Sequence, residues 1–418
     1  MNAVIRPRLL GAALFSVAFT LLLLEAVVRA YFASVVGSRL LFYGTRWQVQ
    51  SVDLSRDRSV STHENRAGGY HEYDPTSHGY AKYFPNEVRF TPSPDRRTSY
   101  AVRINNHGFR GADFAVEKPP GTFRILTLGA SSTFGYHDRD DETYPYYLEQ
   151  ILNQRAAGAP RFQVINFAIP HAASNNILAM FRAEGLALHP DLVTFYEGAN
   201  DAVIVERGEP GPVARLWEAL RARSLAADFL NYTFRLGLVD ERYAWSDELA
   251  QRRSAAFLSN IEALHDECRR HGVGLLLATQ QLKSELVPPE QMKGLTYDDE
   301  ARLVRERMAR GEIGPTHPAP WVAVQPIGAL LAVFSSPRVL LIHQRLMQDL
   351  RGWARAHPDV GFVDVIAALD GDRDLLVNWV HVRPEANRKI AEALAPEILA
   401  MASRRASPPK EDGRAPGR

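Results

Sequence analysis

Short apolar runs alternate with longer amphipathic segments from residue 121 to about residue 403. Nearly continuous apolar runs that end in Gly or polar turn residues predict buried strands, here at 123–128, 163–167, 191–196, 273–279 and 361–364. Apolar residues at helical spacing predict helices at about 140–155, 174–188, 254–271, 338–357 and 384–401. This alternation predicts an α/β fold, a flavodoxin-like, doubly wound parallel sheet of five strands with helices on both faces.

The amino end carries the longest apolar stretch of the chain. Residues 9–24 are uncharged and the stretch continues to Val28, which gives about twenty residues, the length of a helix that crosses a bilayer. Arginines precede it, which favours a cytoplasmic segment 1–8 and a transmembrane signal anchor at 9–30. A cleaved signal peptide is the alternative, because residues 28–30 resemble a small-residue cleavage site. Both interpretations place the remainder of the chain outside the cytoplasm.

An extension at residues 31–120 separates the anchor from the predicted sheet. It is rich in aromatic residues and carries a short strand-and-turn pattern at 102–111. We expect its aromatic side chains to pack on the neighbouring domain. Stacking on sugars is the alternative use for such rings.

The domain at 121–403 has two predicted insertions, 206–250 and 284–335, and a polar tail at 404–418 follows it. The first insertion has a helical pattern. The second ends in the apolar run 327–334, which is too short to span a bilayer and can serve as core, as a lid or as a surface resting on the membrane. The composition of the tail predicts disorder.

Composition and charge narrow the class of function. Apolar residues make up 46% of the chain, charged residues 23%, and the net charge is +1, which gives no reason to expect nucleic acid as a partner. The single cysteine, Cys268, excludes an internal disulfide. The sequence shows no Cys/His cluster at metal-ligand spacing and no phosphate-binding Gly loop, so we expect neither a metal nor a cofactor.

Candidate chemistry follows three of the predicted elements. Ser131 lies in a Gly-bounded turn after the first strand, Asn200 follows the third strand, and His381 precedes the last helix. Because the carboxyl ends of parallel strands share one edge of the sheet, these side chains can converge there. An imidazole that takes the proton of a hydroxyl makes it a nucleophile, and fixed donors stabilise the oxyanion that forms. The combination is typical of acyl transfer.

The three segments read Gly129-Ala-Ser131-Ser-Thr-Phe-Gly, Gly198-Ala-Asn200-Asp201 and Asn378-Trp-Val-His381. In this order and on these elements they resemble the SGNH (GDSL-type) hydrolase family, over about residues 121–403. The resemblance implies that Ser131 is the nucleophile and His381 its base. It implies an oxyanion hole made by the Asn200 amide and the backbone N–H groups of Ser131 and His171, with Gly129, Gly198 and Asp201 as supporting motif residues. Residues 105–110 of the extension look like those of bacterial membrane-anchored members.

Three residues depart from the family pattern. Ala130 replaces an Asp that takes no part in acyl transfer. His171 replaces the oxyanion-hole Gly, so its N–H can donate only if the backbone there needs no glycine-only angles. Asn378 replaces the acid that orients the base; its amide oxygen can accept the imidazole N–H but cannot stabilise an imidazolium as a carboxylate does.

The replacement at 378 leaves three alternatives open. Ser131 and His381 can act as a dyad assisted by Asn378, Asp374 can fold back as the acid, or the site can have little hydrolytic activity.

The resemblance thus implies a membrane-anchored, periplasmic serine hydrolase or acyl transferase of the bacterial inner membrane. Its substrates would be carboxylic esters, O-acyl or O-acetyl groups of envelope polysaccharide or lipid among them. The alternative from a different class is a catalytically weak glycan-binding or assembly protein of a cell-envelope polysaccharide pathway, motivated by the anchor, the aromatic extension and Asn378.

Overall fold

The structure is a computed structural model of the chain. The residues that it describes are 7–36, 80–94 except 81, 84 and 87, 98–156, 160–203, a few positions between 213 and 227, 246–287 except 285, 291–313, and 337–406. The predictions for the amino-terminal residues 1–6, for 37–79, for most of the first insertion, for the apolar run 327–334 and for 407–418 lie outside this set and stay predictions.

A five-stranded parallel sheet forms the centre of the molecule, in the order β4-β3-β5-β6-β7. The strands are β3 (Thr122–Gly129), β4 (Arg161–Ala168), β5 (Leu192–Tyr196), β6 (Gly274–Ala278) and β7 (Gly361–Val363). The predicted α/β class, the five parallel strands and the flavodoxin-like order are confirmed. The order places β3 between β4 and β5, so their three carboxyl ends are neighbours.

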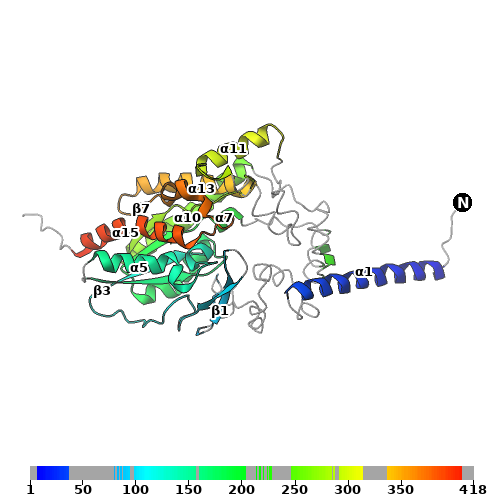
Figure 1. Ribbon diagram of the computed structural model, residues 1–418, viewed down its shortest axis with the longest axis horizontal. Helices are drawn as coiled ribbons and strands as arrows, with labels where there is room; N and C mark the ends of the chain where they lie inside the picture. Colours follow the sequence, from blue (N-terminus) through cyan, green and yellow to red (C-terminus); the bar gives the residue numbers. More distant parts are fainter. Residues whose placement is uncertain are drawn as a thin grey trace, which may run out of the picture.

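Helices cover both faces of the sheet, as Figure 1 shows. Because successive strand residues point to opposite faces, the sheet supports two separate cores. One packs under α5 (Tyr144–Arg155), α14 (Val365–Leu369) and α15 (Pro384–Ala406). The other packs under α6 (Ser174–Met180), α10 (Asp247–Arg270) and α13 (Pro337–Ala356), with α7 (Ala199–Val203) and α11 (Tyr297–Ala309) nearby.

The helices differ from their predicted bounds for local reasons. The helix predicted at about 140–155 begins at Tyr144, with Thr143 as its cap, because residues 140–142 form their own short 3-10 turn. The predicted helix 174–188 is α6 followed by a π turn and a 3-10 turn.

At the carboxyl end, α15 continues to Ala406, so the first residues of the predicted disordered tail are helical. Arg405 Nη2 donates to the Gly272 carbonyl at 2.6 Å, which fixes this last turn against the domain.

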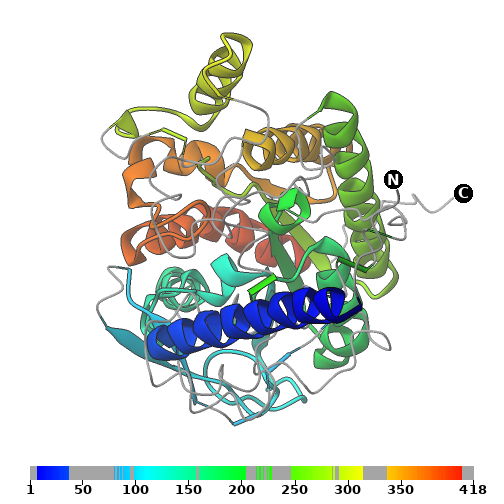
Figure 2. The same cartoon turned by 90° about the vertical axis from the view of Figure 1, so that its right-hand side faces the viewer.

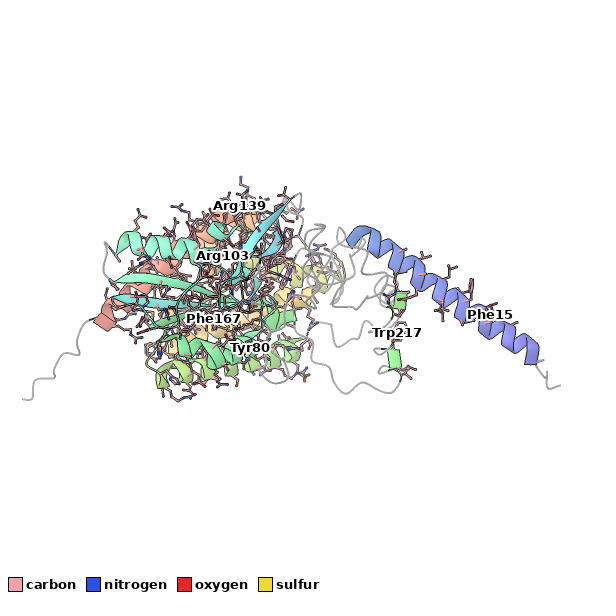
Figure 3. The ribbon with its side chains drawn as sticks, turned by 90° about the horizontal axis from the view of Figure 1, so that it is seen from below. Phe15, Tyr80, Arg103, Arg139, Phe167 and Trp217 are labelled. Atoms are coloured by element: carbon pink, nitrogen blue, oxygen red, sulfur yellow. The ribbon has the colours of Figure 1, made fainter. Side chains whose placement is uncertain are left out.

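The described part of the extension packs on the sheet domain. Strands β1 (Val88–Pro92) and β2 (Ser99–Arg103) form an antiparallel hairpin, and the predicted turn follows with Gly108 at a φ of +83°. The ring of Phe109 stacks on Phe167 of β4 at 4.2 Å between centroids, and Tyr80 donates to Glu184 at 2.6 Å. Figure 3 shows Tyr80 and Phe167 within the body of the molecule. These aromatic residues are packing residues.

The apolar amino end forms α1 (Pro7–Val36), which lies to one side of the sheet domain (Figures 1 and 2). Glu25 near its centre accepts hydrogen bonds from Arg29 at 2.6 Å, from the Ser224 hydroxyl at 2.6 Å and from the Ala226 N–H at 2.9 Å. The helix is therefore tied to the first insertion. Among the helices that the structure describes, none combines the length and the hydropathy needed to cross a membrane, so the transmembrane prediction is not confirmed.

Candidate active site

The nucleophile turn follows β3 directly. Ser131 is the first residue of the short helix α4 (Ser131–Phe134), where backbone N–H groups have no partner within the helix. A Cβ at Gly129 would lie 2.0 Å from Thr133 Oγ1 and 2.9 Å from the Tyr196 carbonyl, so only Gly fits there. Gly135 ends the turn at a φ of +85°. The sequence therefore places a partly buried hydroxyl and a backbone donor together at the carboxyl edge of the sheet.

The segment that carries His381 lies against this turn. Ser132 Oγ donates to the Val380 carbonyl at 3.3 Å, and the rings of Tyr136 and His381 lie 5.2 Å apart. The Tyr136 N–H in turn donates to the Ser131 carbonyl at 2.9 Å. The structure thus brings the segments of Ser131 and His381, far apart in the sequence, into direct contact.

Asn200 follows β5, the neighbour of β3 in the sheet. Its amide nitrogen donates to the Ala172 carbonyl at 2.9 Å, which leaves the second N–H of the same amide for a substrate oxygen. Asp201 accepts from the Ser174 hydroxyl at 2.5 Å and from the Ser174 N–H at 3.0 Å. These bonds join the segment after β4 to the segment after β5.

Gln280, at the end of β6, connects the two sides. Its side-chain oxygen accepts from the Ala199 N–H at 2.8 Å, and its side-chain nitrogen donates to Ser132 Oγ at 3.2 Å. The fourth strand therefore also contributes to the carboxyl edge, which no sequence motif had indicated.

His171 lies in a turn in which the Ala172 N–H donates to the Ile169 carbonyl at 3.3 Å. Its φ is +68°, and Pro170 precedes it. Proline followed by a positive φ is typical of a type II turn, whose third position favours Gly. The backbone is thus in a region that His can adopt only at some cost, and its side chain is exposed.

Asn378 is oriented by the backbone of the residues that follow it. Its Oδ1 accepts from the Val380 N–H at 3.1 Å and the His381 N–H at 2.9 Å. Its Nδ2 lies 2.9 Å from His381 Nδ1 and 3.4 Å from His137 Nε2. A backbone N–H can only donate, so the oxygen must face the backbone and the amide nitrogen must face the two rings. The prediction that the amide oxygen accepts the imidazole N–H is therefore wrong.

His137 is a site residue that the sequence reasoning missed. It is buried at a φ of +82°, and its ring lies 5.2 Å from the ring of His381. Its Nδ1 lies 2.9 Å from the Pro92 carbonyl, and its backbone N–H donates to Thr91 Oγ1 at 2.9 Å. The hairpin of the extension therefore holds a histidine beside the predicted base. The signal available in the sequence was the position of this histidine, two residues after Gly135 at the end of the Ser131 turn.

Asp374 does not reach the imidazole. It is exposed on the 3-10 helix Asp370–Leu375, and Asn378 occupies Nδ1 of His381. This placement does not support the alternative in which Asp374 acts as the acid.

Two buried carboxyl groups support the Asn200 turn. Burial raises the pKa of Glu197 to about 8 and that of Asp201 to about 6, against partial compensation by hydrogen bonds to each. Glu197 accepts from the Asn200 N–H at 2.8 Å. Near neutral pH the carboxyl group of Glu197 is largely protonated.

A group of metal-ligating side chains lies elsewhere. Glu262 and His265 of α10 and His357 after α13 each place one ligand atom within 4.8 Å of the others. Because these helices lead into the amino ends of β6 and β7, the group is at the opposite edge of the sheet. It could hold a divalent cation but would take no part in acyl transfer. Its third member, His357, comes from a distant segment of the chain, so sequence spacing did not reveal the group.

Residues 127–389 match the family model described as the GDSL-like Lipase/Acylhydrolase family. The chain belongs to this family, and it is an enzyme of the ester-hydrolysing class that the family defines. No curated protein matches it.

Among solved structures, the chain is similar to a GDSL-like lipase from Bacteroides thetaiotaomicron, at 12% identity over 70% of this chain and 93% of that one, with a TM-score of 0.38. It is also similar to the lipase/acylhydrolase from Enterococcus faecalis, at 15% identity over 66% of this chain and 95% of that one, with a TM-score of 0.36. At these scores neither structure adds to the family assignment.

Proposed function

We propose that this enzyme hydrolyses carboxylic esters, or transfers their acyl groups, through an acyl-Ser131 intermediate. The observation that carries the proposal is the meeting of three segments at one edge of the sheet. The Ser131 turn contacts the His381 segment through Ser132 and Val380, and Gln280 links it to the Asn200 turn.

The steps follow from this arrangement. Ser131 Oγ attacks the ester carbonyl carbon while its proton passes to Nε2 of His381. The Asn200 amide and the N–H groups of Ser131 and His171 donate to the oxyanion. The C–O bond to the leaving group then breaks, and the leaving alkoxide takes the proton from His381. Water, or an acceptor hydroxyl, attacks the acyl-enzyme with proton transfer through the same ring and releases Ser131.

Substitution of Ser131 tests the nucleophile. Hydrolysis of p-nitrophenyl acetate by the Ser131→Ala variant should fall to the uncatalysed rate. The matched control is Ser99→Ala, which removes a hydroxyl from β2 in the extension and should keep the parent rate. Hydrolysis by Ser131→Ala at the parent rate would rule the mechanism out.

We also propose that the substrate is an O-acyl or O-acetyl ester outside the cytoplasm, and that α1 attaches the enzyme to the membrane. Large apolar side chains of α1 are exposed, Phe15, Phe19 and Leu22 among them, and Figure 3 shows Phe15 well away from the body of the molecule. Exposed apolar surface of this kind favours lipid contact. The mass of the mature amino terminus and the fractionation of cells expressing the full chain test the attachment.

The orientation of Asn378 favours a second candidate, a catalytically weak glycan-binding or assembly protein. An amide nitrogen that donates to the base cannot orient it as a carboxylate does. Under this candidate the parent would show no hydrolysis above background on any acetylated sugar or aryl ester, but would retain glycan binding in a pull-down.

A further inference from the structure

We propose that His137 is a positioning residue that acts through Asn378. Together they hold neutral His381 as the tautomer with its proton on Nε2. Ser131 is therefore acylated only through the minor tautomer, which has its proton on Nδ1. The inference rests on the proposed function, because it concerns the base of the same reaction. Three hydrogen bonds carry it: from His137 to the Pro92 carbonyl of β1, from Asn378 to His137, and from Asn378 to His381.

The first bond fixes the proton of His137. Its Nδ1 lies 2.9 Å from the Pro92 carbonyl, and a carbonyl oxygen can only accept. Nδ1 of His137 therefore carries the proton, and in the neutral ring Nε2 presents a lone pair. The hairpin of the extension thus sets the tautomer of the first ring.

The second and third bonds set the tautomer of His381. The Nδ2 group of Asn378 has two hydrogens, and it lies within reach of His137 Nε2 at 3.4 Å and of His381 Nδ1 at 2.9 Å. Since it can only donate, His381 Nδ1 must accept, and a neutral ring then carries its proton on Nε2.

Reversal of the Asn378 amide would cost most of these contacts. With the amide turned over, Oδ1 could accept a proton from His381 Nδ1, which is the arrangement that a general base needs. The amide nitrogen would then face the N–H groups of Val380 and His381, which in the structure donate to Oδ1 at 3.1 and 2.9 Å. In addition, Oδ1 would face the lone pair of His137. Backbone and His137 together therefore oppose the productive orientation.

The strained backbone at His137 agrees with a role of this kind. A buried non-Gly residue at a φ of +82° is uncommon, and such positions occur where the surrounding structure holds a functional group in place. Arg110 supplies that structure, because its guanidinium donates to the carbonyls of Phe134 and Gly135 at 3.0 and 2.6 Å and of Asp138 at 2.7 Å.

The consequence for catalysis is a reduced rate. Nε2 that already carries a proton cannot take the proton of Ser131, so the observed rate is the rate of the productive tautomer multiplied by its population. An Asp at position 378 would offer one oxygen to the two backbone N–H groups and the other to the N–H of His381 Nδ1. His381 would then keep its proton on Nδ1, and its Nε2 would be able to accept the proton of Ser131.

The test measures the protonation sites of the histidine rings and the rate of hydrolysis in the same variants. In the full chain labelled with ¹⁵N-histidine, long-range ¹H–¹⁵N spectra should show His381 protonated at Nε2 in the parent and at Nδ1 in Asn378→Asp. The kcat of Asn378→Asp on p-nitrophenyl acetate should rise by ~10²–10⁴-fold with little change in KM, by comparison with the loss that the reverse change causes in serine proteases. The His137→Phe variant should shift part of the His381 population to Nδ1–H and raise kcat several-fold.

The matched control is Asn106→Asp, an exposed position in the extension whose side chain contacts Phe114. It should change neither spectrum nor rate. A parent His381 protonated on Nδ1 would overturn the inference, as would an Asn378→Asp variant that moves the proton to Nδ1 without raising kcat. If Ser131→Ala is inactive while Asn378→Asp changes nothing, only this inference fails. If Ser131→Ala is fully active, the proposed function fails and with it the effect on catalysis stated here, whereas the spectra still report the tautomer of His381 independently.

Discussion

Two asparagines, one after β5 and one before α15, make a direct comparison possible. Asn200 gives one N–H to the Ala172 carbonyl, and in the proposed mechanism its other N–H donates to the oxyanion. Asn378 also presents its amide nitrogen, but toward Nδ1 of His381, where acyl transfer needs an acceptor. In the proposed mechanism the same kind of side chain therefore assists oxyanion stabilisation at Asn200 and restrains the base at Asn378.

The difference lies in what the neighbouring backbone presents. Near Asn200 a carbonyl oxygen faces the amide nitrogen, whereas near Asn378 two N–H groups face the amide oxygen. The identity of the residue is thus a weaker guide to its role than the direction of the backbone groups around it.

The largest effect should come from truncating the two asparagines in parallel. Asn200→Ala removes a donor to the oxyanion and should lower kcat ~10²–10³-fold. Asn378→Ala removes a group that favours the unproductive tautomer and should change kcat by less than about 10-fold, because no acceptor for Nδ1 is lost. Steady-state kinetics on p-nitrophenyl acetate measure both. Equal losses of kcat in the two variants would contradict the different roles assigned to the two amides.

The segments around His137 and His381 should also depend on the extension for their stability. Arg110 is buried and donates to three backbone carbonyls around His137 and to Asp140 at 2.9 Å. Arg110→Ala leaves these groups unsatisfied and should lower the free energy of unfolding by about 2–4 kcal/mol, measured in urea. Arg103→Ala is the matched control; its ion pair with Asp113 is exposed, so it should cost less than about 1 kcal/mol. Similar losses would contradict the assigned role of Arg110.

On the oxyanion side, Glu197 should make stability depend on pH. Burial raises its pKa in the folded state to about 8, above its value in the unfolded chain, so the folded state holds the proton more tightly. Its contribution is complete at low pH and decreases as pH rises toward 8. Between pH 6 and 8 the parent should lose about 2 kcal/mol that Glu197→Gln does not lose. Parallel urea titrations at both pH values measure this, and equal slopes would contradict it.

The smallest effect should come from His171→Gly. The φ of +68° costs His more than Gly, but Gly also gains freedom in the unfolded chain, so the free energy of unfolding should change by less than about 1 kcal/mol. The rate should stay near the parent rate, because the donor is the backbone N–H. A large loss of kcat would show that the imidazole itself contacts the substrate.

Local patterns predicted the sheet well, and they placed Ser131, the proposed nucleophile, in the turn after its first strand. The apolar runs gave all five strands in the correct order, since a buried parallel strand is a local signal. The positions of Ser131, Asn200 and His381 at the ends of elements followed from the same patterns. The start of α5 was predicted too early, because residues 140–142 form a separate 3-10 turn before the Thr143 cap.

The rest of the site depends on contacts between distant segments. His137 lies beside His381 only because β1 of the extension accepts its Nδ1 proton, and no motif records that pairing. The direction of the Asn378 amide depends on where two N–H groups point after the chain turns, which residue identities do not specify. Gln280 likewise becomes a site residue only through the order of the strands.

The most direct test of the account is covalent labelling of the full chain with a fluorophosphonate, followed by peptide mapping. If Ser131 is the nucleophile, one adduct should form, on Ser131; it should form slowly in the parent, faster in Asn378→Asp and not at all in Ser131→Ala. Labelling of Ser131→Ala at the parent rate, or an adduct on any other residue, would contradict it.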